Sequence, residues 1–123
     1  MIIVTFNGTE ELMYEIEEFG AALDRFDAQP IFELWLNVPG SASISMLRNN
    51  EHAFLMYLRE SGDSGFVSVG DEADGSVQYT LGNGQVNEYP RSWCIPLEEC
   101  YKALAFFFVN DGVRPERLRW QEN

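Results

Sequence analysis

The sequence predicts an α+β fold in which an antiparallel meander sheet of about six to eight strands packs with two helices, one N-terminal and one C-terminal. Three observations predict this fold. Apolar residues repeat at helical spacing near each end of the chain, short strand-like runs lie between, and Gly-, Pro- and Asn-containing turns join those runs. With 123 residues, 46% of them hydrophobic, the sequence predicts one domain over residues 1–123.

The N-terminal part contains a short strand-like run over residues 2–6, which ends at Asn7-Gly8. We expect a helix to follow directly, with Asn7 or Thr9 as its cap. Its buried stripe repeats in steps of four and three, through Leu12, Ile16, Phe19, Leu23 and Phe26. The acidic residues Glu11, Glu15 and Glu18 fall off this stripe, so we expect them on a solvated face.

The middle of the chain is strand-like. Longer strands are predicted over residues 31–38, 43–48 and 53–60, with turns at Pro39-Gly40 and Asn49-Asn50. Shorter strands are predicted over residues 66–69, 77–81 and 85–89, and Gly82-Asn83-Gly84 is a hairpin signal. Short connections of this kind favour antiparallel pairing.

The C-terminal part predicts a strand over residues 92–95 and then a helix with Pro96 at its first position, where a missing N–H has no cost. Apolar residues at helical spacing continue to Asn110, and Gly112 followed by Pro115 ends the helix. Residues 117–120 are expected to add an edge strand.

The charge balance excludes some classes of partner. Eight Lys and Arg residues against 20 Asp and Glu residues give a formal net charge of −12, which disfavours binding to nucleic acid or to an anionic membrane. Such a field attracts a basic protein surface. No apolar run approaches the roughly 20 residues that span a bilayer, and the first residues lack the basic stretch of a signal peptide. We therefore expect a cytoplasmic protein whose Cys94 and Cys100 are reduced, buried thiols.

Three motifs resemble chemical sites, and each fails on its details. Gly62-Asp63-Ser64-Gly65 looks like a serine-protease tetrapeptide, but the lone His52 is poorly placed to activate the serine. Asp71-Glu72-Ala73-Asp74-Gly75 has the wrong spacing for a calcium loop and is interpreted as a solvated acidic loop. One histidine and two cysteines do not make a zinc site. We predict no catalytic residue, no metal and no cofactor.

One acidic segment, residues 60–90, contains six acids and no base. Trp35 and Trp93 are expected mainly in the core, whereas Tyr79 and Tyr89 alternate with polar residues, so at least one is a candidate exposed anchor. We expect this segment to supply much of the contact with a basic partner. The candidate partner-binding residues are Asp63, Asp71, Glu72, Asp74, Tyr79, Glu88 and Tyr89.

The C-terminal third carries a resemblance to a known family. Its signature runs through Trp93-Cys94-Ile95-Pro96-Leu97-Glu98, Ala103, Phe106-Phe107 and the segment Gly112-Val113-Arg114-Pro115-Glu116-Arg117-Leu118-Arg119-Trp120. This stretch resembles immunity-protein family one of bacterial polymorphic toxin systems, and it is similar to immunity against a double-stranded-DNA cytosine deaminase toxin. The resemblance implies an inhibitor that binds a cognate toxin with a basic substrate groove, and a C-terminal tryptophan that packs on the sheet.

Two other functions stay open at this point. The chain is alternatively an acidic nucleic-acid mimic that regulates another basic protein, or, with less support, a small hydrolase. The sequence does not predict the oligomeric state.

Overall fold

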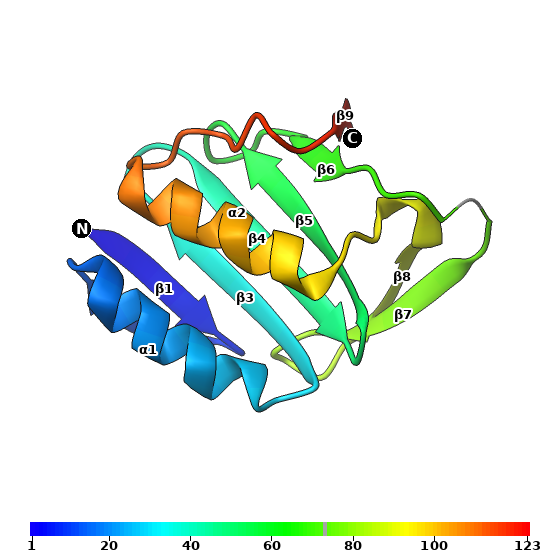
Figure 1. Cartoon of the computed structure of the whole chain (residues 1–123), viewed down its shortest axis with the longest axis horizontal. Helices are drawn as coiled ribbons and strands as arrows, with labels where there is room; N and C mark the ends of the chain where they lie inside the picture. The colour runs from blue at the N-terminus through cyan, green and yellow to red at the C-terminus, as the bar shows by residue number, and fades with distance from the viewer. Residues whose placement is uncertain (73) are drawn as a thin grey trace.

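The computed structural model describes residues 1–72 and 74–123, and it confirms the α+β class (Figure 1). Seven strands form one antiparallel sheet in the order β2-β1-β3-β4-β5-β6-β9, and β7 and β8 pair separately. Two helices lie on one face of the large sheet (Figure 1). The bounds are β1 Ile2–Phe6, β2 Thr9–Met13, α1 Ile16–Asp27, β3 Ile31–Asn37, β4 Ser43–Asn49, β5 His52–Leu58, β6 Phe66–Ser68, β7 Ser76–Thr80, β8 Val86–Pro90, α2 Leu97–Val109 and β9 Trp120–Glu122.

The expected helix start is wrong, because Asn7-Gly8 is a hairpin turn. Both residues have positive φ, 48° and 86°, as a two-residue type I′ turn requires. The chain therefore returns as β2, and Leu12 lies on this edge strand instead of on the helix. Helix α1 begins at Ile16, where the Glu18 side chain accepts hydrogen bonds from the Tyr14 and Glu15 amides at 3.1 and 3.0 Å.

The expected strand over residues 92–95 is also wrong. Residues Arg91–Trp93 form a short 3-10 helix, and the chain then passes beside β5, where the Ile95 amide donates to the Ala53 carbonyl at 3.0 Å. Pro96 caps α2, which starts one residue later than expected. The last strand, β9, begins at Trp120, where the expected edge strand ends.

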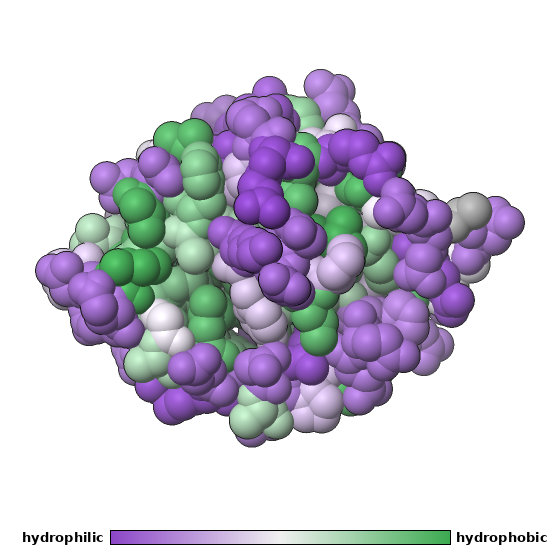
Figure 2. Space-filling model, viewed as in Figure 1, coloured by the Kyte–Doolittle hydropathy of each residue, from purple (hydrophilic) through white to green (hydrophobic). Residues whose placement is uncertain are grey.

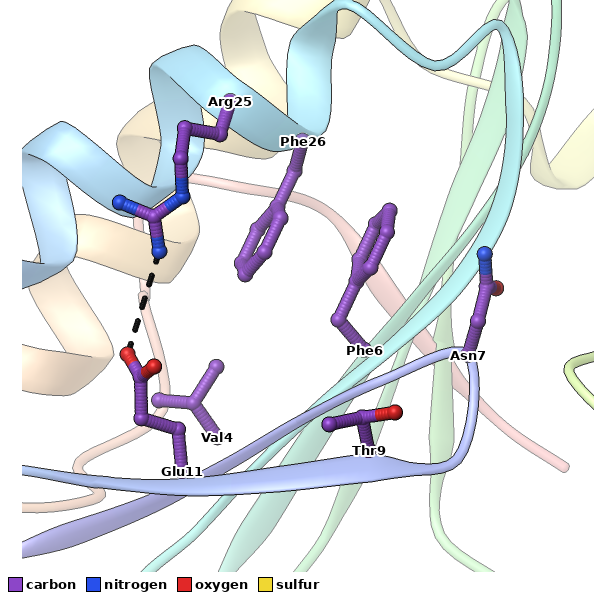
Figure 3. A pocket seen from close by; sticks show the side chains of 7 residues that line it. All are labelled: Val4, Phe6, Asn7, Thr9, Glu11, Arg25 and Phe26. Atoms are coloured by element: carbon purple, nitrogen blue, oxygen red, sulfur yellow. Dashed lines mark ion pairs between the residues drawn. The ribbon is translucent and has the colours of Figure 1, made fainter.

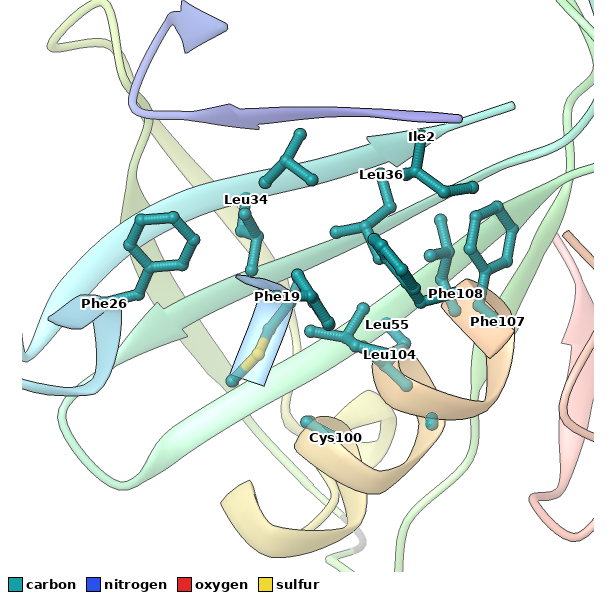
Figure 4. Close-up of a cluster of buried hydrophobic side chains, with 14 of the residues drawn as sticks. Ile2, Phe19, Phe26, Leu34, Leu36, Leu55, Cys100, Leu104, Phe107 and Phe108 are labelled. Atoms are coloured by element: carbon teal, nitrogen blue, oxygen red, sulfur yellow. The ribbon is translucent and has the colours of Figure 1, made fainter. Parts of the chain in front are cut away.

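The main core fills the space between the helices and the inner face of the sheet. Phe19 of α1 stacks on Phe108 of α2, with ring centroids 5.0 Å apart, above Leu34, Leu36 and Leu55 of the central strands (Figure 4). Cys100 is part of this core, and both cysteines are buried free thiols, as expected.

A second, smaller core lies on the outer face of the sheet. The β7–β8 hairpin folds against β3 and β4 there, so Val77 and Tyr79 pack against Leu47 and Phe54. Trp93 is half-buried in this cluster. Trp35 is also half-buried on the outer face but is not part of the cluster, and its indole N–H donates to Glu33 at 3.0 Å. The outer core fixes the acidic segment to the sheet.

Candidate functional surface

Negative charge dominates the surface because most Lys and Arg side chains already form ion pairs with carboxylates of the same chain. Seven ion pairs engage seven of the eight Lys and Arg residues. Seven of the 20 carboxylates take these partners, which leaves 13 without a cation in residues 1–72 and 74–123. The excess that the sequence shows is therefore a property of the folded surface.

Asp63 differs from the other candidate contact residues because it stabilises a turn. Its carboxylate accepts hydrogen bonds from the Arg59 amide, Nε and Nη2, each at 2.9 Å, and its side chain is only 7% exposed. These hydrogen bonds to Arg59 hold the pKa of Asp63 well below its ordinary value of 3.8. The Asp63 carboxylate therefore has a structural role in the loop between β5 and β6.

Tyr79 is not an exposed anchor. Its side chain is 1% exposed in the outer core, its hydroxyl lies 3.3 Å from the Cys94 sulfur, and burial raises its pKa. Strand alternation explains the error: in β7 the residues Val77 and Tyr79 point to the sheet, while their neighbours are exposed. Tyr89 is half-buried and stacks on Trp93, with centroids 5.6 Å apart.

The remaining acids of the segment are accessible. Asp71, Glu72, Asp74 and Glu88 are all exposed. Asp71 pairs with Arg119 at 2.7 Å, yet its side chain is 96% exposed, and Glu88 accepts a hydrogen bond from Ser76 at 2.7 Å. The run 71–75, interpreted from the sequence as a solvated acidic loop, also includes Ala73, which lies outside the described residues.

The serine and the histidine that suggested a hydrolase lie far apart in the fold. His52 begins β5, and Ser64 lies in the loop after its other end, so six strand steps of about 3.3 Å place them roughly 20 Å apart along the strand. The hollow of about 330 Å³ between the β1–β2 hairpin and α1 is lined by Phe6, Phe26 and five others, and its Glu11 and Arg25 pair at 3.9 Å (Figure 3). None of its lining residues is a serine, cysteine or histidine, and a larger hollow of about 530 Å³ is lined by Ser41, Ser43 and Ser61 but by no histidine.

Among the described residues, no group of three or more His, Cys, Asp or Glu residues could hold a metal ion. No helix in the described part of the chain is long and apolar enough to cross a membrane.

The C-terminal motif fixes the last strand to the sheet. The Arg114 guanidinium lies over the rings of Phe66 and Trp120, at 4.6 and 5.9 Å from their centroids, and the Trp120 indole donates to the Pro115 carbonyl at 2.8 Å. Trp120 packs at the margin of the main core, as the resemblance implied. These contacts hold β9 beside β6.

Residues 7–122 match the family described as Immunity protein Imm1. The chain belongs to this family. Imm1 membership makes it a toxin-neutralising immunity protein whose partner is a cognate toxin, and it indicates a non-catalytic inhibitor. A search of curated proteins finds no match.

Sequence reasoning missed a second surface feature, at the end of the molecule where α2 stops. Figure 2 shows apolar surface gathered there, over the C-terminal end of α2 and the start of the chain. Its members include Tyr14, Val109 and Val113. Tyr14 and Val113 lie just outside the two helices, and Val109 ends α2 on a face that is not buried.

Proposed function

We propose that this Imm1 protein neutralises a toxin that acts on nucleic acid, with a cytosine deaminase as the leading candidate, by covering the toxin's active site or its substrate groove. The observation that carries the proposal is the set of 13 carboxylates without a cation partner in the described residues. An enzyme that binds nucleic acid needs a basic groove, and an acidic protein is complementary to such a groove. The choice of a deaminase rests on the resemblance of the C-terminal third.

The acidic segment is proposed to act mainly by attracting the toxin. Asp71, Glu72, Asp74 and Glu88 are exposed, so their field reaches into solvent. Complementary charge of this kind accelerates encounter and orients the partners more than it strengthens the final complex. Direct occupation of the groove and steric blocking beside it are both compatible with this role.

We also propose that the protein works in the cytoplasm. A toxin that modifies nucleic acid meets its substrate there, and an inhibitor must reach the toxin before the substrate does. This proposal rests on the toxin's proposed target and is open to a fractionation experiment.

Co-expression with its cognate toxin domain, sought among the genes next to that for this chain, tests the proposed function. Cells that express both are expected to survive, and the two proteins should co-purify. A toxin domain inactivated at its catalytic residue is the matched control, because it should bind without requiring protection. Death of the co-expressing cells with no co-purification would contradict the proposal, as would a toxin that is neutralised but has no activity on nucleic acid.

A further inference from the structure

Six large apolar side chains are exposed at one end of the molecule and form what we call the end patch. It consists of Met1, Tyr14, Ile16, Phe106, Val109 and Val113. Tyr14 is 64% and Val109 61% exposed. Single exposed apolar residues are common on protein surfaces, but several exposed apolar side chains in one area are typical of an interaction site.

Separate elements bring these residues together. Ile2 pairs with Met13 at the end of the β1–β2 hairpin, so Met1 and Tyr14 continue side by side beyond it. The helices run antiparallel, because Phe19 near the start of α1 stacks on Phe108 near the end of α2. The start of α1, at Ile16, therefore lies beside the end of α2, at Val109.

Val113 joins the patch through the chain that leaves α2. The Gly112 amide donates to the Phe107 carbonyl at 3.0 Å, and the Val113 amide donates to Asn110 at 3.3 Å. The Gly112 carbonyl in turn accepts a hydrogen bond from the Tyr57 hydroxyl at 2.6 Å. The patch is thus presented by fixed backbone.

The rim of the end patch is acidic. Glu15, Glu17, Glu18 and Asp111 are exposed there, and none of them forms an ion pair within the described residues. The last turn of α2 has no basic residue, so the negative end of its dipole is not offset. Asp111 adds another negative charge to this helix end.

The nearest cation in the chain is already engaged. Arg114 follows Val113, but its guanidinium pairs with Glu116 at 3.1 Å and lies over Phe66. An apolar centre with an acidic rim is complementary to a protein surface with an apolar centre and a basic rim. A second copy of this chain would instead bring like charges together.

We propose that the end patch is the surface that anchors the cognate toxin, a basic protein with an apolar contact next to its substrate groove. This inference rests on the proposed function and deepens it by naming the docking surface. The end patch and the residues around Asp71 lie at opposite ends of the molecule (Figure 1). A standard interface buries only about 800 Å² per partner, so one interface does not include both ends of the molecule. We therefore assign the steering of the toxin to the acidic segment and its anchoring to the end patch.

Alanine substitutions test this assignment with the inactive toxin domain as the probe. Tyr14→Ala and Val109→Ala are each expected to raise Kd at least tenfold, mainly through faster dissociation, as truncated interface anchors do. Val86→Ala is the matched control, because Val86 is 56% exposed on β8, in a hairpin that contributes no residue to the end patch. It should change Kd less than twofold. Surface plasmon resonance measures both rates.

The outcomes separate the docking surface from the proposed function. Unchanged Kd for both Tyr14→Ala and Val109→Ala, or a larger effect of Val86→Ala, would overturn the docking surface while the protein still neutralises its toxin. Sedimentation equilibrium of the chain alone should show a monomer; a dimer that Tyr14→Ala dissociates would also overturn it. Thermal unfolding checks each variant, and Val113→Ala replaces any variant that does not fold. Failure of the wild-type protein to bind the toxin contradicts the proposed function itself.

Discussion

Removing charge from the acidic segment should slow toxin binding by a calculable amount. The variant carries Asp71→Asn, Glu72→Gln and Asp74→Asn, three exposed positions. Electrostatic steering raises association rate constants from roughly 10⁶ to roughly 10⁹ M⁻¹s⁻¹ at low salt, a gain of about three powers of ten. Shared among a net charge of −12, this gain is about a quarter of a power of ten per charge. Three charges then account for a slowing of about sixfold.

Stopped-flow association at several salt concentrations measures this effect. The dissociation rate should change little, and the dependence of association on salt should become shallower because screening has less charge to act on. A control variant with Glu98→Gln, Glu99→Gln and Glu116→Gln removes the same formal charge outside the acidic segment, from carboxylates that each hold a cation, whereas in the first variant only Asp71 does. If the first variant associates at the wild-type rate with the wild-type salt dependence, the steering role of the segment is refuted.

Three further predictions concern stability, each measured by chemical denaturation. Tyr57→Phe should lower the free energy of unfolding by about 1–2 kcal/mol, because the buried Gly112 carbonyl loses its 2.6 Å hydrogen bond; an unchanged midpoint would contradict this. Asp63→Asn should destabilise at pH 7. Because the pKa of Asp63 is lowered in the fold, its contribution is present above its ordinary pKa and is lost as pH falls through the folded value, so the difference from wild type should narrow below about pH 4. Asp111→Asn should stabilise by about 0.3–1 kcal/mol, since it removes a negative charge at the end of α2 where φ is 49°, and it should weaken toxin binding.

The elements with clear periodicity could be predicted from the sequence, and the exceptions have specific causes. The long strands and the C-terminal helix agree with expectation within a few residues. The start of the first helix was misplaced because Leu12 fits the four-three spacing by coincidence, whereas the Asn7-Gly8 turn signal was the stronger observation. The 3-10 turn at Arg91–Trp93 depends on contacts with distant residues, such as the Gly70 amide donating to Ser92 at 2.7 Å, which no local pattern reveals.

The candidate site was only partly predictable for a related reason. Counting charges by position identified an acidic segment, and its acids at positions 71, 72, 74 and 88 are indeed exposed. The count of charges could not show that Asp63 would form an ion pair with Arg59. Nor could alternation in β7 show which face would be covered, since the outer core that buries Tyr79 forms from residues far apart in the sequence. The end patch needed the antiparallel helices to bring its members together.

Competition with nucleic acid tests the central claim most directly. Fluorescence anisotropy of a labelled DNA duplex bound to the inactive toxin domain is followed while the Imm1 protein is added. We predict full displacement of the DNA at one immunity protein per toxin, with a return to the anisotropy of free DNA. A ternary complex that keeps the DNA bound, formed with a toxin that remains active, would contradict the claim.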